Sequence, residues 1–184
     1  MLSRLQIAAY RQRRRTSKRF IGRPAKYLYK FLRQILNFGG TSEFSLELEK
    51  SQHSFQFRAR NTQFGALFMP QNANGYEPEV TALLDLLIEE NSIFYDIGSN
   101  WGFFTLYALS NKNFNGSVHA FEPNPTTFDD LNDIADQSPF RDRITCHQIA
   151  LSDHSGTARM ELFDGIQSGL ARLTQNKSGF KVNT

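Results

Sequence analysis

Several features that define other protein classes are absent from this chain of 184 residues. It has one cysteine, Cys146, so no internal disulfide can form. No apolar run approaches the ~20 residues that a membrane-spanning helix needs. The four histidines are scattered without metal-ligand spacing, so we expect no metal site. A hydrophobic content of 40% indicates a globular protein. The single cysteine fits a reducing compartment, and we expect this protein in the cytoplasm.

Acidic residues are absent from residues 1–42, which carry 11 of the 21 lysines and arginines. Residues 43–184 carry the other 10 and all 18 acidic residues, so a basic arm precedes an acidic domain. Such an arm is a solvated tail, a contact for an anionic membrane or nucleic acid, or a transit peptide. Pro24 and Gly39 predict a helix over residues 24–37 with one apolar and one basic face. This helix either packs on the domain or lies peripherally on a membrane; we rank membrane contact through residues 1–37 above nucleic acid.

Alternating polar and apolar residues over 44–58 predict an antiparallel hairpin with a turn near Ser51–His53. A polar loop is predicted over residues 70–75. Pro78 then begins a helix, and we expect its apolar stripe to be buried. The stripe consists of Val80, Leu83, Leu84, Leu87 and Ile88.

Another helix is predicted from Pro125, after the cap residue Asn124. We expect its apolar side to face the core and its aspartates, Asp130 among them, to face water. A strand over about Ile144–Leu151 is expected to form a hairpin with Thr157–Phe163. The remaining residues are expected to be mostly loop, with a short strand near residues 171–173.

The most informative stretch is Ile93–Gly102. An apolar, β-prone run ends at Ile97, glycine and small polar residues follow, and an apolar run resumes at Phe103. This order predicts a buried strand, a tight turn and a buried helix. Glycine permits positive φ and lets a ligand approach bare backbone, and the start of the helix offers unpaired N–H groups to polar ligand atoms.

A carboxylate marks the end of each of two successive predicted strands. Asp96 lies near the end of the first, where burial costs several kcal/mol unless a partner pairs with it. Glu122 ends the next apolar run, Val118–Phe121, where a carboxylate can accept hydrogen bonds from ribose hydroxyls. Asp96 alone favours a residue that caps its own turn. The pair of carboxylates favours a nucleoside-type cofactor.

The alternation of helices and strands predicts an α/β sheet with right-handed crossovers. The second and third strands would lie on the same side of Ile93–Ile97, so the other edge of this strand would stay open. Native domains avoid a long, apolar, open edge. We therefore expect that further strands follow Thr184, that the sequence is a fragment, or that another chain covers this edge.

Four segments resemble the FkbM family of S-adenosylmethionine-dependent methyltransferases: Tyr76–Pro78, Phe94–Thr105, Ala120–Asn124 and Ile149–Asp153. The likeness covers about residues 76–175, and its most specific part is the glycine turn combined with the Phe-Glu-Pro-Asn block. It implies a Rossmann-like class I methyltransferase sheet that is incomplete at the C-terminus. The chain would then divide into a basic arm with an amphipathic helix (1–42), a β-hairpin and loop (43–75), and a partial methyltransferase domain (76–184).

The resemblance also implies a cofactor, S-adenosyl-L-methionine, and the residues around it. Gly98, Asn100 and Gly102 would line its methionine end, with Asp96 behind them, and Glu122 would hold the ribose. The full set of implied cofactor-binding residues is Asp96, Gly98, Ser99, Asn100, Gly102, Glu122, Pro123, Ala150 and Leu151. The last two residues of this set would lie near the adenine.

The family's activity would be O-methylation of a hydroxyl on a sugar or natural-product acceptor, that is, a small molecule or glycan. No catalytic base is assigned, because the family's substrate-facing half would follow Thr184. A nicotinamide-dependent dehydrogenase is disfavoured, because residue 100 is asparagine where its fingerprint has glycine. The remaining alternative is a non-catalytic, truncated Rossmann-like protein that the basic arm anchors to a membrane or to nucleic acid.

Overall fold

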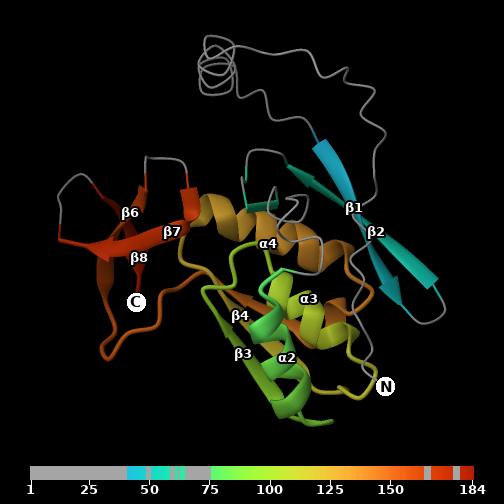
Figure 1. Cartoon of the computed structure of the whole chain (residues 1–184). Helices are drawn as coiled ribbons and strands as arrows, with labels where there is room; N and C mark the ends of the chain where they lie inside the picture. The colour runs from blue at the N-terminus through green and yellow to red at the C-terminus, as the bar shows by residue number, and fades with distance from the viewer. Residues whose placement is uncertain are drawn as a thin grey trace.

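The computed structural model describes residues 41–48, 51–58, 61, 63–64, 76–163, 167–175 and 179–184. Residues 1–40 of the basic arm, and with them the helix predicted at 24–37, lie outside the described residues, as does the polar loop predicted at 70–75. The elements are β1 (Thr41–Leu48), β2 (Ser51–Arg58), α2 (Pro78–Leu87), β3 (Ile93–Ile97), α3 (Phe103–Ser110), β4 (Ser117–Phe121), α4 (Pro125–Gln137), η3 (Arg141–Arg143), β5 (Ile144–His147), β6 (Thr157–Phe163), β7 (Gln167–Thr174) and β8 (Phe180–Asn183) (Figure 1).

The parallel sheet has the order β3-β4-β5, so the predicted α/β class is confirmed. Helices α3 and α4 connect these strands and pack on one face of the sheet. Phe94, Val118 and Ile144 point to that face and form a core with residues of both helices. Among the described residues, β3 has no strand on its outer edge, as the sequence predicted. The prediction that this strand is buried is wrong for one of its faces, where Ile93, Tyr95 and Ile97 are exposed.

Helix α3 is buried along most of its length, as predicted. Helix α4 begins as predicted, with the Asn124 side chain accepting a hydrogen bond from the Thr126 N–H at 3.1 Å. The expectation that Asp130 faces water is wrong, because this side chain is buried under the end of β2. Arg58 of β2 lies 3.8 Å from its carboxylate. The aspartate pattern indicated a solvated face because it does not show that a hairpin lies along α4.

The apolar stripe predicted for α2 is not buried. Leu83 is 53% exposed and Leu87 is 67% exposed, while Leu84 and Ile88 are half-buried toward α3. The helix therefore meets the core along one edge of the stripe, and no described residue covers the other edge. The described α-helices have 8 to 13 residues, and none combines the length and apolar character that crossing a bilayer demands.

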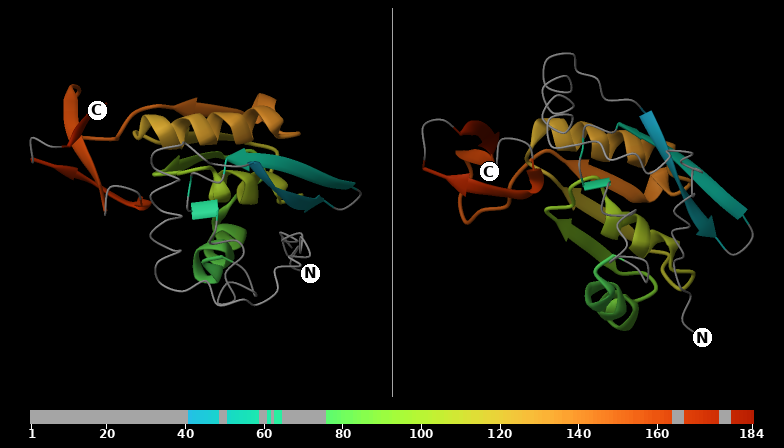
Figure 2. Two further views of the ribbon diagram at one scale, coloured as in Figure 1. Left: turned by 90° about the horizontal axis from the view of Figure 1, so that it is seen from above. Right: turned by 45° about the horizontal axis from the view of Figure 1, so that its top comes forward.

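The C-terminal strands form a second, antiparallel sheet in the order β7-β6-β8. The predicted hairpin between the third parallel strand and Thr157–Phe163 is wrong, because β6 pairs with β7 and β8 instead of β5. Strand β5 ends at His147, before the predicted Leu151, and β7 and β8 occupy much of the predicted loop. Figures 1 and 2 show this sheet on the side of the parallel sheet opposite the β1–β2 hairpin.

The predicted N-terminal hairpin is confirmed, although Ser51–His53 belong to β2 instead of a turn. Its apolar side chains share one core with α3 and α4. Trp101, which follows β3, packs at 5.4 Å from Phe44 and at 4.6 Å from Phe64, measured between ring centroids. The hairpin is therefore joined by aromatic packing to the turn that follows β3.

We expect Phe44→Ala to destabilise the fold by about 3–5 kcal/mol, because it removes a fully buried ring that touches Phe55 and Trp101. The measurement is urea unfolding followed by tryptophan fluorescence, since Trp101 is the single tryptophan. The matched control is Leu86→Ala on α2. This side chain is 81% exposed, so we expect a change within about 0.5 kcal/mol. Equal effects of the two substitutions would contradict a shared aromatic core.

Candidate functional site

The turn after β3 is held against the end of β4. The N–H groups of Gly98 and Ser99 both donate to the carbonyl oxygen of Phe121, at 2.9 and 3.0 Å. The N–H of Gly102 donates back to the carbonyl of Ser99 at 2.8 Å and closes the turn. The carboxyl ends of two neighbouring parallel strands therefore meet at this turn, where ligands of open α/β sheets bind.

Three residues of the turn have backbone conformations that side chains disfavour. The φ angles are 77° at Gly98, 52° at Asn100 and 93° at Gly102. A Cβ atom at Gly98 would meet no atom within 4 Å, so bare backbone faces open space there. At Gly102 a Cβ atom would lie 2.9 Å from a methyl group of Leu131, so this glycine lets α3 begin close to α4. The two glycines thus have different roles, one toward open space and one in packing.

Asp96 is buried at the end of β3 and points toward α3. Its Oδ2 accepts hydrogen bonds from the N–H of Thr105 at 3.0 Å and from the Thr105 hydroxyl at 2.7 Å. Burial raises the pKa of Asp96 to about 6, and the two bonds from Thr105 lower it only in part. Asp96 therefore satisfies a backbone N–H in the first turn of α3, and the printed bonds of its side chain go to this helix instead of to its own turn.

Glu122 is buried at the end of β4, beside the same turn. Its Oε2 accepts the N–H of Asn100 at 3.1 Å, and its Oε1 accepts the N–H of Asn124 at 2.8 Å. Burial raises the pKa of Glu122 to about 7 against these two hydrogen bonds, and the charge of Asp96 adds to the rise. The two predicted carboxylates are thus brought together, close enough to repel each other.

The remaining predicted residues divide into two groups. Ser99 and Pro123 are buried next to the turn, and the Ser99 hydroxyl has no hydrogen-bond partner among the described residues. An unsatisfied buried hydroxyl costs about 1–3 kcal/mol, which a polar ligand atom can recover. Ala150 and Leu151 lie beyond the end of β5; the Ala150 N–H donates to the carbonyl of Asn183, the last residue of β8, and Leu151 is exposed. The structure thus links Ala150 to the C-terminal sheet.

Two residues at the site were missed from the sequence. Thr105 supplies both donors to Asp96, and Asn61 donates its side-chain N–H to Asn100 Oδ1 at 3.2 Å. A threonine at the third position of a predicted helix gives a weak signal for the first. Nothing near Asn61 in the sequence indicates the second contact. Trp101, within the turn, is a packing residue, because its ring lies against those of Phe44 and Phe64.

Comparison with known proteins finds a local similarity to one protein that is named as a methyltransferase. No family model matches the chain. The chain is similar to hexuronic acid methyltransferase AglP of Haloferax volcanii, with 40% identity over 63 residues. The match covers 34% of this chain and 25% of that protein, so the chain spans about a quarter of the curated relative. The similarity agrees with the enzyme class that the sequence predicted, and membership of the FkbM family stays a prediction.

A solved structure of a candidate transferase from Pyrococcus horikoshii is similar to this one over 67% of this chain and 47% of that chain. The TM-score is 0.41 and the sequence identity is 14%. These values are too low to support a fold or a function for this protein.

The raised pKa of Glu122 predicts how stability depends on pH. A carboxyl whose pKa is higher in the folded state stabilises the fold below its ordinary pKa, 4.5, and this contribution is lost as the pH rises through about 7. Glu122→Gln cannot ionise. We therefore expect wild-type protein to lose up to about 3 kcal/mol of unfolding free energy relative to this variant between pH 4.5 and 7.5, measured by urea titration.

Asp153→Asn provides a control of opposite sign. The hydrogen bond with His154 lowers the pKa of Asp153, so ionisation of this exposed carboxyl does not disfavour the folded state. Wild-type protein should lose no stability relative to Asp153→Asn over the same pH range. Parallel pH profiles for wild-type protein and Glu122→Gln would contradict the raised pKa of Glu122.

Proposed function

We propose that this chain binds S-adenosyl-L-methionine and acts as a methyltransferase of FkbM type on a hydroxyl acceptor. The observation that carries the proposal is the pair of buried carboxylates, Asp96 and Glu122, at the ends of neighbouring strands beside a turn with one open, bare face. The local similarity to a protein named as a methyltransferase supports the same class.

The electrostatics of the site favour a cationic ligand. The charge of Asp96 disfavours ionisation of Glu122, which adds to the cost of burying the Glu122 carboxylate. A ligand that brings positive charge next to them lowers this cost and the pKa of both groups. S-adenosyl-L-methionine carries such charge on its sulfonium and amino groups, whereas a nicotinamide dinucleotide brings a negatively charged pyrophosphate.

The residues present fit this cofactor. Glu122 can accept hydrogen bonds from ribose hydroxyls, because each carboxylate oxygen retains a lone pair beyond the one that its backbone N–H uses. The open face at Gly98 admits the methionine end, and the Ser99 hydroxyl is available for a polar atom. We place Ala150 and Leu151 near the adenine, on the resemblance alone. The cofactor supplies an activated methyl group, and the protein positions the acceptor oxygen for transfer.

For the acceptor we propose a sugar hydroxyl. The similar protein is named for a hexuronic acid, a sugar that carries hydroxyl groups and a carboxyl group, so its name supports a sugar acceptor, and the choice of a hydroxyl rests on the resemblance to the FkbM family. Within the 63 matched residues this similarity does not select one hydroxyl, so the acceptor is proposed as a class.

Calorimetric titration of the purified chain with S-adenosyl-L-methionine tests the proposal, and we expect saturable binding. Gly98→Ala should weaken it at least about tenfold, because its Cβ would occupy the open face of the turn and strain a positive φ. Glu122→Gln should weaken binding by a similar factor through loss of charge-assisted hydrogen bonds. Gly156→Ala is the matched control, since its Cβ would meet no atom closer than 3.8 Å and should leave the affinity unchanged.

Parallel titrations with NAD and with anionic vesicles separate the rival functions. Saturable binding of NAD alone would replace the methyltransferase with a dehydrogenase. Binding to vesicles alone, with a steep dependence on salt, would indicate an anchoring protein. Equal affinity of wild-type protein and Gly98→Ala for S-adenosyl-L-methionine would place the ligand away from the turn and contradict the proposed site.

A further inference from the structure

We propose that Asn61 is a positioning residue for the candidate cofactor site, because it fixes the conformation of Asn100 and thereby the backbone donor that Glu122 accepts. The role of Asn61 in holding Asn100 stands on contacts alone. Its consequence for ligand affinity rests on the proposed function.

Asn100 has the least favourable backbone conformation in the turn for its residue type. Its φ of 52° lies in the left-handed region, which disfavours residues other than glycine. Asparagine tolerates this region better than most residues, especially when its side chain has a hydrogen-bond partner. Asn61 Nδ2 provides that partner by donating to Asn100 Oδ1 at 3.2 Å. A contact from 39 residues away in the sequence therefore supports the disfavoured backbone conformation.

The backbone of Asn100 in turn determines where Glu122 lies. The Asn100 N–H donates to Glu122 Oε2 at 3.1 Å, and this bond exists only while the peptide keeps its orientation. A change in the backbone angles of Asn100 would turn the N–H away and leave the Glu122 carboxylate with one fewer donor in a buried place. The contacts thus run from Asn61 through Asn100 to Glu122.

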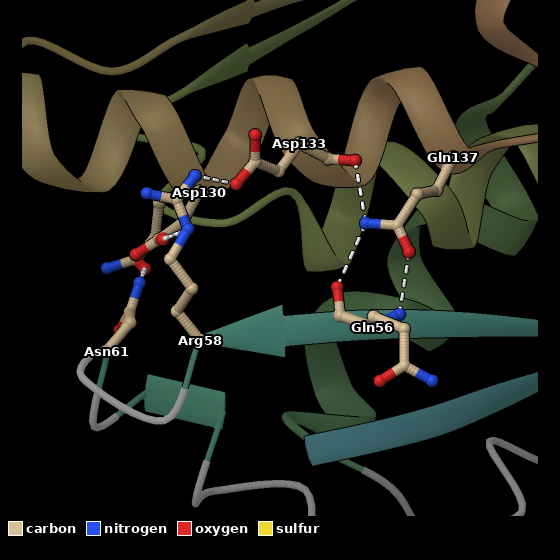
Figure 3. Close-up of polar contacts among 7 residues, drawn as sticks. Gln56, Arg58, Asn61, Asp130, Asp133 and Gln137 are labelled. Atoms are coloured by element: carbon tan, nitrogen blue, oxygen red, sulfur yellow. Dashed lines mark hydrogen bonds and ion pairs between the residues drawn. The ribbon is translucent and has the colours of Figure 1, made fainter. Parts of the chain in front are cut away.

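Asn61 is itself held in place. It is buried, and its side-chain Oδ1 accepts the backbone N–H of Gln63 at 3.0 Å. Its backbone N–H donates to the carbonyl of Arg58 at 3.2 Å. Arg58 makes ion pairs with Asp130 and Asp133 of α4 (Figure 3). The end of β2 is therefore tied to α4, so that Asn61 reaches the turn from a fixed support.

A second tie between β2 and α4 lies away from the turn. Figure 3 shows Gln137 of α4 opposite Gln56 of β2. The Gln56 N–H donates to Gln137 Oε1 at 2.6 Å, and Gln137 Nε2 donates to the Gln56 carbonyl at 2.9 Å. This pair supports the hairpin without touching Asn100 or Glu122, which makes Gln137 a matched control for a purely structural effect.

The first measurement needs no ligand: a carbon-13 NMR titration of the Glu122 carboxyl group. Asn61→Ala should raise the pKa of Glu122 above its wild-type value, because a hydrogen bond that stabilises the charged carboxylate is weakened. Gln137→Ala also removes hydrogen bonds between the hairpin and α4, but should leave this pKa unchanged. An unchanged pKa in Asn61→Ala, or an equal shift in Gln137→Ala, would overturn the proposal.

The second measurement places the same substitution in an Asn100→Gly background. Glycine adopts a φ near 52° without support from a side chain, so Asn61→Ala should no longer shift the pKa of Glu122 there. A shift as large as in the wild-type background would show that Asn61 acts by another route and overturn the proposal. This cycle also separates positioning from a general loss of stability.

The third measurement is the affinity for S-adenosyl-L-methionine. Asn61→Ala should weaken it by roughly 5- to 10-fold and Gln137→Ala by less than about 2-fold. An unchanged affinity with a shifted pKa would overturn the positioning role in binding. If wild-type protein does not bind this cofactor at all, the proposed function fails, while the titration of Glu122 still decides whether Asn61 holds the turn.

Discussion

The bond between the Glu122 carboxylate and the backbone of the glycine turn is the constraint on which the site depends. One carboxylate oxygen of Glu122 accepts the N–H of Asn100 and the other accepts the N–H of Asn124, so this single side chain joins the turn after β3 to the start of α4. The arrangement is energetically unfavourable on its own, because it keeps a carboxylate buried near Asp96. Strain and buried charge of this kind persist only where the surrounding structure fixes them, and they concentrate at functional sites.

The surrounding structure that fixes the turn comes largely from the N-terminal hairpin and the residues just after it. Trp101 lies inside an aromatic cluster with Phe44 and Phe64, and the neighbouring Asn100 is held by Asn61. Two successive residues of the turn are therefore held by apolar packing and by a hydrogen bond, from Phe44 of the hairpin and from Asn61 and Phe64, which follow it. The sequence alone predicts the hairpin as a unit separate from the methyltransferase domain. In the structure it packs against the turn of the candidate site, through the contact of Phe44 with Trp101.

The sequence predicted the parts of the fold that depend on local pattern. The strand, turn and helix of Ile93–Ser110 and the capped start of α4 at Asn124 follow from apolar runs, glycine and proline, and the structure has them where predicted. The errors concern contacts between distant segments. Asp130 was expected in water because nothing in its own helix shows that β2 covers it, and Asn61 was missed for the same reason. The strand after α4 was paired with its nearest successor in the sequence, whereas β6 pairs with β7 and β8.

The face of β3 that is exposed among the described residues carries different side chains from those that hold the turn. Side chains of a strand alternate between faces, and on β3 the exposed Ile93, Tyr95 and Ile97 lie opposite the buried Asp96. Asp96 bonds to α3, on the face that the helices and the hairpin cover. Whatever covers the outer face and open edge of β3 in the working protein therefore meets different side chains from those that hold the turn. The geometry around Glu122 is set from the covered side, by elements that the described residues already contain.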